Sequence, residues 1–206
     1  MTQHITTAVL ILTMMLNTAA TAGQSHAGSE TDGVVLLGQC YAFILKAPAG
    51  WVLDTTVAKS SGLAATLYPE GSSWKGGISV MYVRVIYKDK HKRTLGDVVQ
   101  SDIKEFKSRN RTTTVSSMPA VTTRDRKRAL MRHFYDAQNK NEEAVAYIDE
   151  LRLCSSGSNR VGRYGERGVV VLVVLSSRTR KDYDRSLEAF RQLAGSYFFV
   201  HELAGL

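Results

Sequence analysis

The sequence lacks the short motifs that mark the common catalytic centres. It contains no HExxH motif, no CxxC motif, no P-loop and no nucleophile elbow. Its histidines are scattered, and His91, His133 and His201 each lack a second metal ligand at strand or helix spacing. We therefore predict neither a metal site nor a cofactor.

Charged residues are missing from positions 1–22, apart from the titratable His4. This segment contains an apolar run, Ala8 to Leu16, and then the small residues Ala20-Thr21-Ala22 that a signal peptidase requires. The apolar run is too short to span a bilayer. We interpret 1–22 as a signal peptide, with a retained membrane anchor as the alternative. No cysteine follows the small residues, so a lipid anchor is not indicated.

The mature chain has no sign of a second domain. Positions 23–33 form a polar leader with little to bury. The remaining stretch, 34–206, is long enough for one domain with its own core, and it shows no internal repeat and no transmembrane segment. We expect an exported protein, periplasmic or extracellular.

Cysteine is scarce, with two residues in the chain, Cys40 and Cys154. In an oxidising compartment an even pair is more often bridged than free. We therefore predict a disulfide between them. The alternative is a pair of buried thiols that behave as small apolar residues.

Basic residues outnumber acidic ones, 27 against 19, which gives a formal net charge of +8. Such a surface favours anionic partners, and an exported chain meets little nucleic acid. The charge is densest in "TTRDRKRALMR", which holds Arg124, Arg126, Lys127, Arg128 and Arg132. We predict a contact surface there. A solvated loop between two strands is the alternative, and in either case its charges are expected to contribute little to stability.

A glycine-rich loop, 157–168, supplies a second group of basic residues, Arg160, Arg163 and Arg167, together with Tyr164. Their side chains and the exposed backbone amides suit an anion. A hairpin loop that needs glycine for its turns is the alternative reading.

The two tryptophans receive different predictions. Trp51 follows the turn Pro48-Ala49-Gly50, and we expect it to pack in the core at the corner between two strands. Trp74 lies among Gly and Ser in "YPEGSSWKGG". It is either an exposed aromatic anchor for a partner or a ring folded back onto the sheet edge.

Hydrophobic periodicity predicts strands and two helices. The segments 78–88 and 168–177 are apolar on both faces, which is typical of central strands covered on both sides. Helical spacing marks 94–109, with Thr94 as N-cap, and a last segment that ends near Gly195. Other strands are expected at 34–37, 40–46, 51–54, 64–68, 112–117, 129–136 and 143–154.

This order predicts an α+β fold, an antiparallel β-sheet flanked by two amphipathic helices. With "APAGW", a capped helix after "RTL" and a closing "LAGSYFF", the chain from Val34 to Val200 resembles the PsbP-like fold, an α/β/α sandwich. The resemblance implies a binding or assembly module and no shared catalytic residues.

Two functions remain open. The first is a non-enzymatic exported module that contacts an acidic envelope protein or an anionic surface through basic loops. The second is an envelope hydrolase whose site is assembled from scattered polar residues such as His133, Asp136 and Tyr164.

Overall fold

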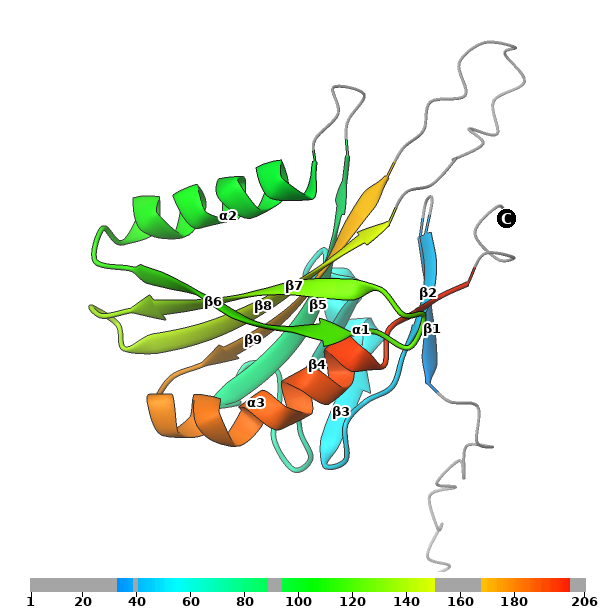
Figure 1. The fold of residues 1–206 in the computed structure, drawn as a ribbon. Helices are drawn as coiled ribbons and strands as arrows, with labels where there is room; N and C mark the ends of the chain where they lie inside the picture. Colours follow the sequence, from blue (N-terminus) through cyan, green and yellow to red (C-terminus); the bar gives the residue numbers. More distant parts are fainter. Residues whose placement is uncertain (1–32, 39–40, 89–93, 151–167, 201–206) are drawn as a thin grey trace, which may run out of the picture. The chain divides into compact units, whose positions relative to one another are not determined.

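The structure is a computed structural model that describes residues 33–38, 41–88, 94–150 and 168–200 (Figure 1). The predicted signal peptide and nearly all of the leader lie outside these ranges. The elements follow in the order β1 (Val34–Gly38), β2 (Tyr41–Leu45), β3 (Trp51–Asp54), α1 (Thr55–Ser60), β4 (Ala65–Pro69), β5 (Ser79–Tyr87), α2 (Leu95–Arg109), β6 (Thr114–Thr122), β7 (Arg128–Asp136), β8 (Asn141–Glu150), β9 (Val169–Ser177), α3 (Arg180–Gly195) and β10 (Phe198–Phe199).

A seven-stranded antiparallel sheet forms the centre of the fold, with the strand order β3-β4-β5-β9-β8-β7-β6. Strand β9 is central and buried from Val169 to Leu175. Its even- and odd-numbered residues enter different core clusters, one on each face of the sheet. This confirms the prediction that a strand apolar on both faces is covered on both sides.

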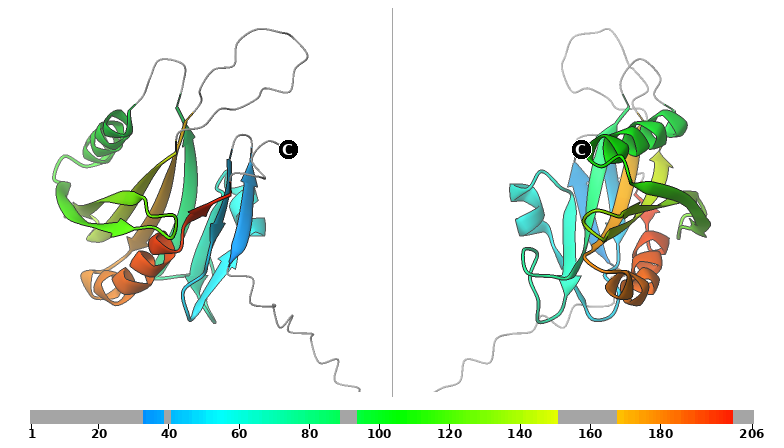
Figure 2. Two further views of the ribbon diagram at one scale, coloured as in Figure 1. Left: turned by 45° about the vertical axis from the view of Figure 1, so that its right-hand side comes forward. Right: turned by 90° about the vertical axis from the view of Figure 1, so that its left-hand side faces the viewer.

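The core on one face of the sheet joins β5, β8 and β9 to α3 and to a smaller sheet of order β1-β2-β10 (Figure 2). Phe43 and Tyr197 are fully buried in this core, with ring centroids 5.3 Å apart. The two-residue strand β10 pairs with β2, so the last described strand lies beside one of the first.

The opposite face of the sheet is covered by α2, whose Val98 and Val99 are buried against it. Thr94 begins the helix through a capping box with Asp97: each residue's side chain accepts a hydrogen bond from the other's backbone N–H. Phe106 stacks on Phe134 of β7 at a centroid distance of 4.1 Å. The predicted α+β arrangement, with helices on both faces, is confirmed.

Both edges of the large sheet are short or irregular. Strand β3 has four residues. Strand β6 carries Pro119, and its pairing with β7 shifts between Met118 and Val121, so Pro119 and Ala120 face Leu130 alone.

The turn before β3 has the predicted form. Trp51 N–H donates to the Pro48 carbonyl at 3.1 Å, and Gly50 takes a left-handed φ of 75° that suits glycine. Trp51 is half-buried and packs against the α3-face core, in agreement with the structural role expected for it.

Candidate functional site

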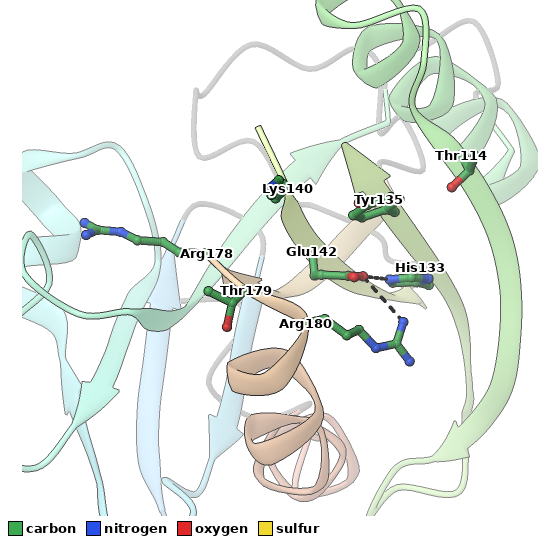
Figure 3. Close-up of a pocket in the computed structure, with 8 residues that line it drawn as sticks. All are labelled: Thr114, His133, Tyr135, Lys140, Glu142, Arg178, Thr179 and Arg180. Carbon is green, nitrogen blue, oxygen red and sulfur yellow. Dashed lines mark hydrogen bonds and ion pairs between the residues drawn. The ribbon is translucent and has the colours of Figure 1, made fainter. Parts of the chain in front are cut away.

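A cavity of about 660 Å³ lies beside the N-terminus of α3 (Figure 3). Two groups of residues line it: Thr114, His133, Tyr135, Lys140 and Glu142 from the β6–β8 end of the sheet, and Arg178, Thr179 and Arg180 from the start of α3. The volume lies within the range of small-ligand sites.

Antiparallel register brings the strand residues together. Thr114 is the Cα partner of Tyr135, and Tyr135 is the partner of Glu142, so one row crosses β6, β7 and β8. His133 points to the same face of the sheet because it is two residues from Tyr135. The pairing of β6, β7 and β8 therefore places this half of the cavity wall.

The centre of the wall is an ion-paired group. His133 Nε2 contacts Glu142 Oε2, and Arg180 Nη1 lies 3.7 Å from the same oxygen. Glu142 is buried, with 4 % of its side chain exposed. Figure 3 shows His133 and Arg180 directed at the Glu142 carboxylate from different sides. The positive charge of Arg180 compensates the negative charge of Glu142 within the protein.

Side-chain hydrogen bonds order the β7–β8 turn and the N-terminus of α3, which both border the cavity. Asp136 accepts hydrogen bonds from the backbone N–H groups of Gln138 and Asn139 at 3.0 and 3.2 Å, which fixes the β7–β8 turn and lowers the pKa of Asp136. The side chain of Asn139 is the first cause of that shift. Thr179 caps α3 by accepting from Asp182 N–H at 3.2 Å.

The cavity carries an excess of positive charge. Within the described ranges, Lys140 and Arg178 form no ion pair, and both are exposed. Arg180 is shared between Glu142 and Asp184, whose carboxylate raises the pKa of the guanidinium. In Figure 3 the Arg178 side chain extends away from the Glu142 group.

A different buried polar group lies under α2, on the other face of the sheet. Tyr147 donates a hydrogen bond to Asp102, whose pKa is raised by burial. Glu143 is largely buried, and desolvation raises its pKa to about 7. Its Oε2 has no hydrogen-bond partner among the described residues, while Ser176 donates to Oε1 at 3.4 Å.

The basic cluster predicted from the sequence is divided by the structure. Arg124 and Arg126 are exposed in the β6–β7 turn, and the Arg124 guanidinium lies 5.4 Å from the centre of the Phe198 ring. Lys127 is different, because its ammonium pairs with the buried Glu150. This contact with a buried carboxylate predicts a larger contribution to stability from Lys127 than from the other charges of the loop. Whether the loop binds a partner stays a prediction.

Arg128 and Arg132 border a second cavity, of about 460 Å³, at the irregular part of β6. Trp74, from the β4–β5 loop, is half-buried and meets Tyr82 edge to face, with ring centroids 6.1 Å apart. The Trp74 ring is therefore folded back onto the sheet, at the interior strand β5 rather than at an edge. Its role as an anchor for a partner stays a prediction.

The other predicted site residues lie outside the described residues: Arg160, Arg163, Tyr164, Arg167, Cys40 and Cys154. The loop and disulfide hypotheses therefore stay predictions. Of the residues named for a hydrolase, His133 lies in the α3 cavity, whereas Asp136 is engaged in its turn.

Sequence reasoning missed Lys140, Glu142, Arg178 and Arg180. Glu142 stands in a strand and Arg178 near a helix start, positions where isolated charges are common, so no local pattern marks them. The available signal was the hairpin register, which places Glu142 opposite Tyr135 and diagonal to His133.

No protein-family model matches the chain, and no curated protein matches it in sequence. Among solved structures it is similar to LpqN of Mycobacterium tuberculosis, described as involved in cell envelope biogenesis. Their identity is 10 %, the TM-score is 0.51, and the match covers 77 % of this chain and 83 % of that one. It also matches the solution structure of PsbP from the cyanobacterium Synechocystis, with 13 % identity, a TM-score of 0.45 and coverage of 85 % and 99 %.

The likeness to LpqN is one of fold. The α+β element order expected from the resemblance to PsbP-like proteins is found in the chain itself. None of the described helices combines the length and apolar character needed to cross a membrane.

Proposed function

We propose that the protein is a non-enzymatic, exported module of the cell envelope that holds an anionic group of a partner at the α3 cavity. The observation that carries this proposal is the charge of the cavity: Lys140 and Arg178 border it with no ion pair among the described residues, while the charge of Glu142 is compensated by Arg180. An incoming carboxylate or phosphate meets uncompensated positive charge.

The attraction comes from side chains more than from the helix end. Asp182 in the first turn of α3 already places a carboxylate beside the helix N-terminus, where its Oδ2 accepts from the Thr179 hydroxyl at 2.5 Å. A concave cavity receives a protruding acidic side chain better than it receives a flat bilayer. This favours an acidic protein over an anionic membrane surface.

Two observations support the proposed location in the cell envelope. The sequence predicts export, and LpqN, the structural neighbour with the same fold, is described as acting in cell envelope biogenesis. Fold likeness alone does not carry function. The test therefore concerns the charges.

The test is titration of the protein that lacks 1–22 with a polyglutamate peptide, and separately with phosphatidylglycerol vesicles. The double variant Lys140→Gln/Arg178→Gln is expected to weaken peptide binding by about tenfold, because charge-assisted contacts are lost. The control Lys59→Gln/Lys104→Gln removes the same charge from exposed positions elsewhere. An equal loss of peptide affinity in both double variants would show that net charge, and not the α3 cavity, causes the binding. Binding to the vesicles without binding to the peptide would favour a membrane surface as the partner.

One observation favours a hydrolase as the second candidate. Ser116 Oγ lies 3.5 Å from His133 Nδ1, and Glu142 contacts the other ring nitrogen. In such a site Ser116 Oγ attacks an ester carbonyl and its proton passes to His133, which then protonates the leaving alcohol. Water hydrolyses the resulting acyl-serine.

The hydrolase hypothesis requires turnover that depends on Ser116. Hydrolysis of p-nitrophenyl acetate that disappears in Ser116→Ala, while the variant unfolds at the same temperature, would support it. A background rate that is equal in both proteins would exclude it.

A further inference from the structure

The second cavity lies where β6 leaves β7. Across the strand pair, Met118 is opposite Met131 and Val121 is opposite Ala129, so two residues of β6, Pro119 and Ala120, face one residue of β7, Leu130. Pro119 has no N–H with which to continue the ladder. The register shift is accompanied by a cavity of about 460 Å³, lined in part by Met118, Leu130 and Met131. Bulges of this kind are frequent beside binding sites.

The lining combines apolar residues with two arginines and Ser117. Arg128, Leu130 and Arg132 alternate along β7, so the three side chains leave the same face of the strand. Leu95, the first residue of α2, contributes to the wall and packs with Leu130 in the α2-face core. The result is an apolar patch with a guanidinium group on either side of it.

Arg132 is the better placed of the two arginines. It is half-buried, and its Nη1 donates to the Met131 carbonyl at 2.9 Å, which restrains the guanidinium while other N–H groups remain for a ligand. Arg128 is exposed. An anion beside a partly buried and oriented guanidinium is screened less by solvent and salt than one beside an exposed side chain.

We infer that this bulge cavity binds a single-chain anionic amphiphile, such as a fatty acid, with the acyl chain over Leu130 and Leu95 and the head group on Arg132. The combination of charges and apolar lining selects this class. A small anion leaves the apolar lining uncovered, and an uncharged detergent leaves the arginines without a counter-charge. The inference is independent of the function proposed for the α3 cavity.

The test is calorimetric titration with three probes below their micellar concentrations: dodecanoate, acetate and dodecyl maltoside. Dodecanoate is expected to bind at least tenfold more tightly than the other two, and its affinity is expected to fall with added salt. Arg132→Gln is expected to weaken dodecanoate binding by about tenfold, and Arg128→Gln by less. The matched control is Arg185→Gln, an exposed arginine of α3, which is expected to leave binding unchanged.

Nuclear magnetic resonance locates the ligand independently of any variant. On addition of dodecanoate, the amide signals of Met118, Ala120 and Leu130 are expected to shift most. Equal affinity for dodecyl maltoside and dodecanoate would overturn the inference, as would an unchanged affinity in Arg132→Gln or shifts confined to another part of the molecule.

Discussion

The Tyr197 hydroxyl donates a hydrogen bond to Glu150 Oε1 at 3.0 Å, inside the protein where α3 gives way to β10. Lys127, from the β6–β7 turn, pairs with the same carboxylate oxygen. Only 3 % of the Glu150 side chain is exposed, so these two partners replace the water that the carboxylate leaves on folding. Lys127, which in the sequence is one of several charges in a basic run, therefore stabilises the buried carboxylate next to β10.

Lys127→Gln is expected to lower the free energy of unfolding by about 2 to 3 kcal/mol, because Glu150 stays buried with one partner fewer. Arg126→Gln, in the same turn, is expected to change it by less than about 0.5 kcal/mol. Urea denaturation followed by circular dichroism measures both. Equal values for the two variants would show that the Lys127–Glu150 pair contributes nothing.

Glu143 makes stability depend on pH. Its pKa rises from 4.5 to about 7 on folding, chiefly through desolvation, so the folded state holds this proton more tightly than the unfolded state. Stability from this group is present below about pH 4.5 and is lost as the pH rises towards 7. The difference corresponds to on the order of 3 kcal/mol.

Glu143→Gln is therefore expected to be more stable than the unaltered protein at pH 8. Its stability is expected to fall much less between pH 5 and 7 than that of the unaltered protein. Thermal unfolding across this pH range measures the effect. Glu70→Gln, an exposed position, is the control and is expected to follow the unaltered protein. A decline that persists in Glu143→Gln would assign the pH dependence to other groups.

The two tryptophans are expected to differ in their contribution to stability. Trp51→Ala opens space beside the α3-face core and is expected to cost about 2 to 4 kcal/mol. Trp74→Ala loses chiefly the contact with Tyr82, with an expected cost of about 1 kcal/mol. Urea denaturation followed by circular dichroism separates the two. A folded Trp51→Ala protein of unchanged stability that fails to bind polyglutamate would move Trp51 from the core to the binding site.

The cysteine prediction is tested by thiol labelling of denatured, non-reduced protein exported to an oxidising compartment. No titratable thiol is expected if Cys40 and Cys154 are bridged. Replacing both with serine is then expected to lower stability by roughly 2 to 5 kcal/mol. Two labelled thiols per chain would contradict the bridge.

Periodicity was enough to predict most of the fold. The strands at 78–88 and 168–177, and helix α2 with its Thr94 cap, follow from local spacing and capping chemistry. It missed α1, whose six residues are too few to show a helical repeat, and β10, whose two residues pair only with distant β2. It also ended β6 at Ser117, since Pro119 resembles a strand end, whereas the edge position of β6 tolerates proline.

The candidate sites were harder to predict because they depend on register. The run of basic residues in the sequence does not indicate that Lys127, in the β6–β7 turn, pairs with the buried Glu150. Nor does it indicate that Arg132, in β7, lines a cavity. Glu142, His133 and Arg180 meet through strand pairing and helix docking, at sequence separations that no local motif spans.

The edges of the large sheet also bear on how molecules of this protein behave at high concentration. An open edge strand that is long and flat is a template for strands of other chains, and hence for aggregation. One edge here is the four-residue β3, and the other, β6, is interrupted by Pro119 and its bulge. The irregularity that accompanies the cavity beside Leu130 therefore also protects the protein against edge-to-edge polymerisation.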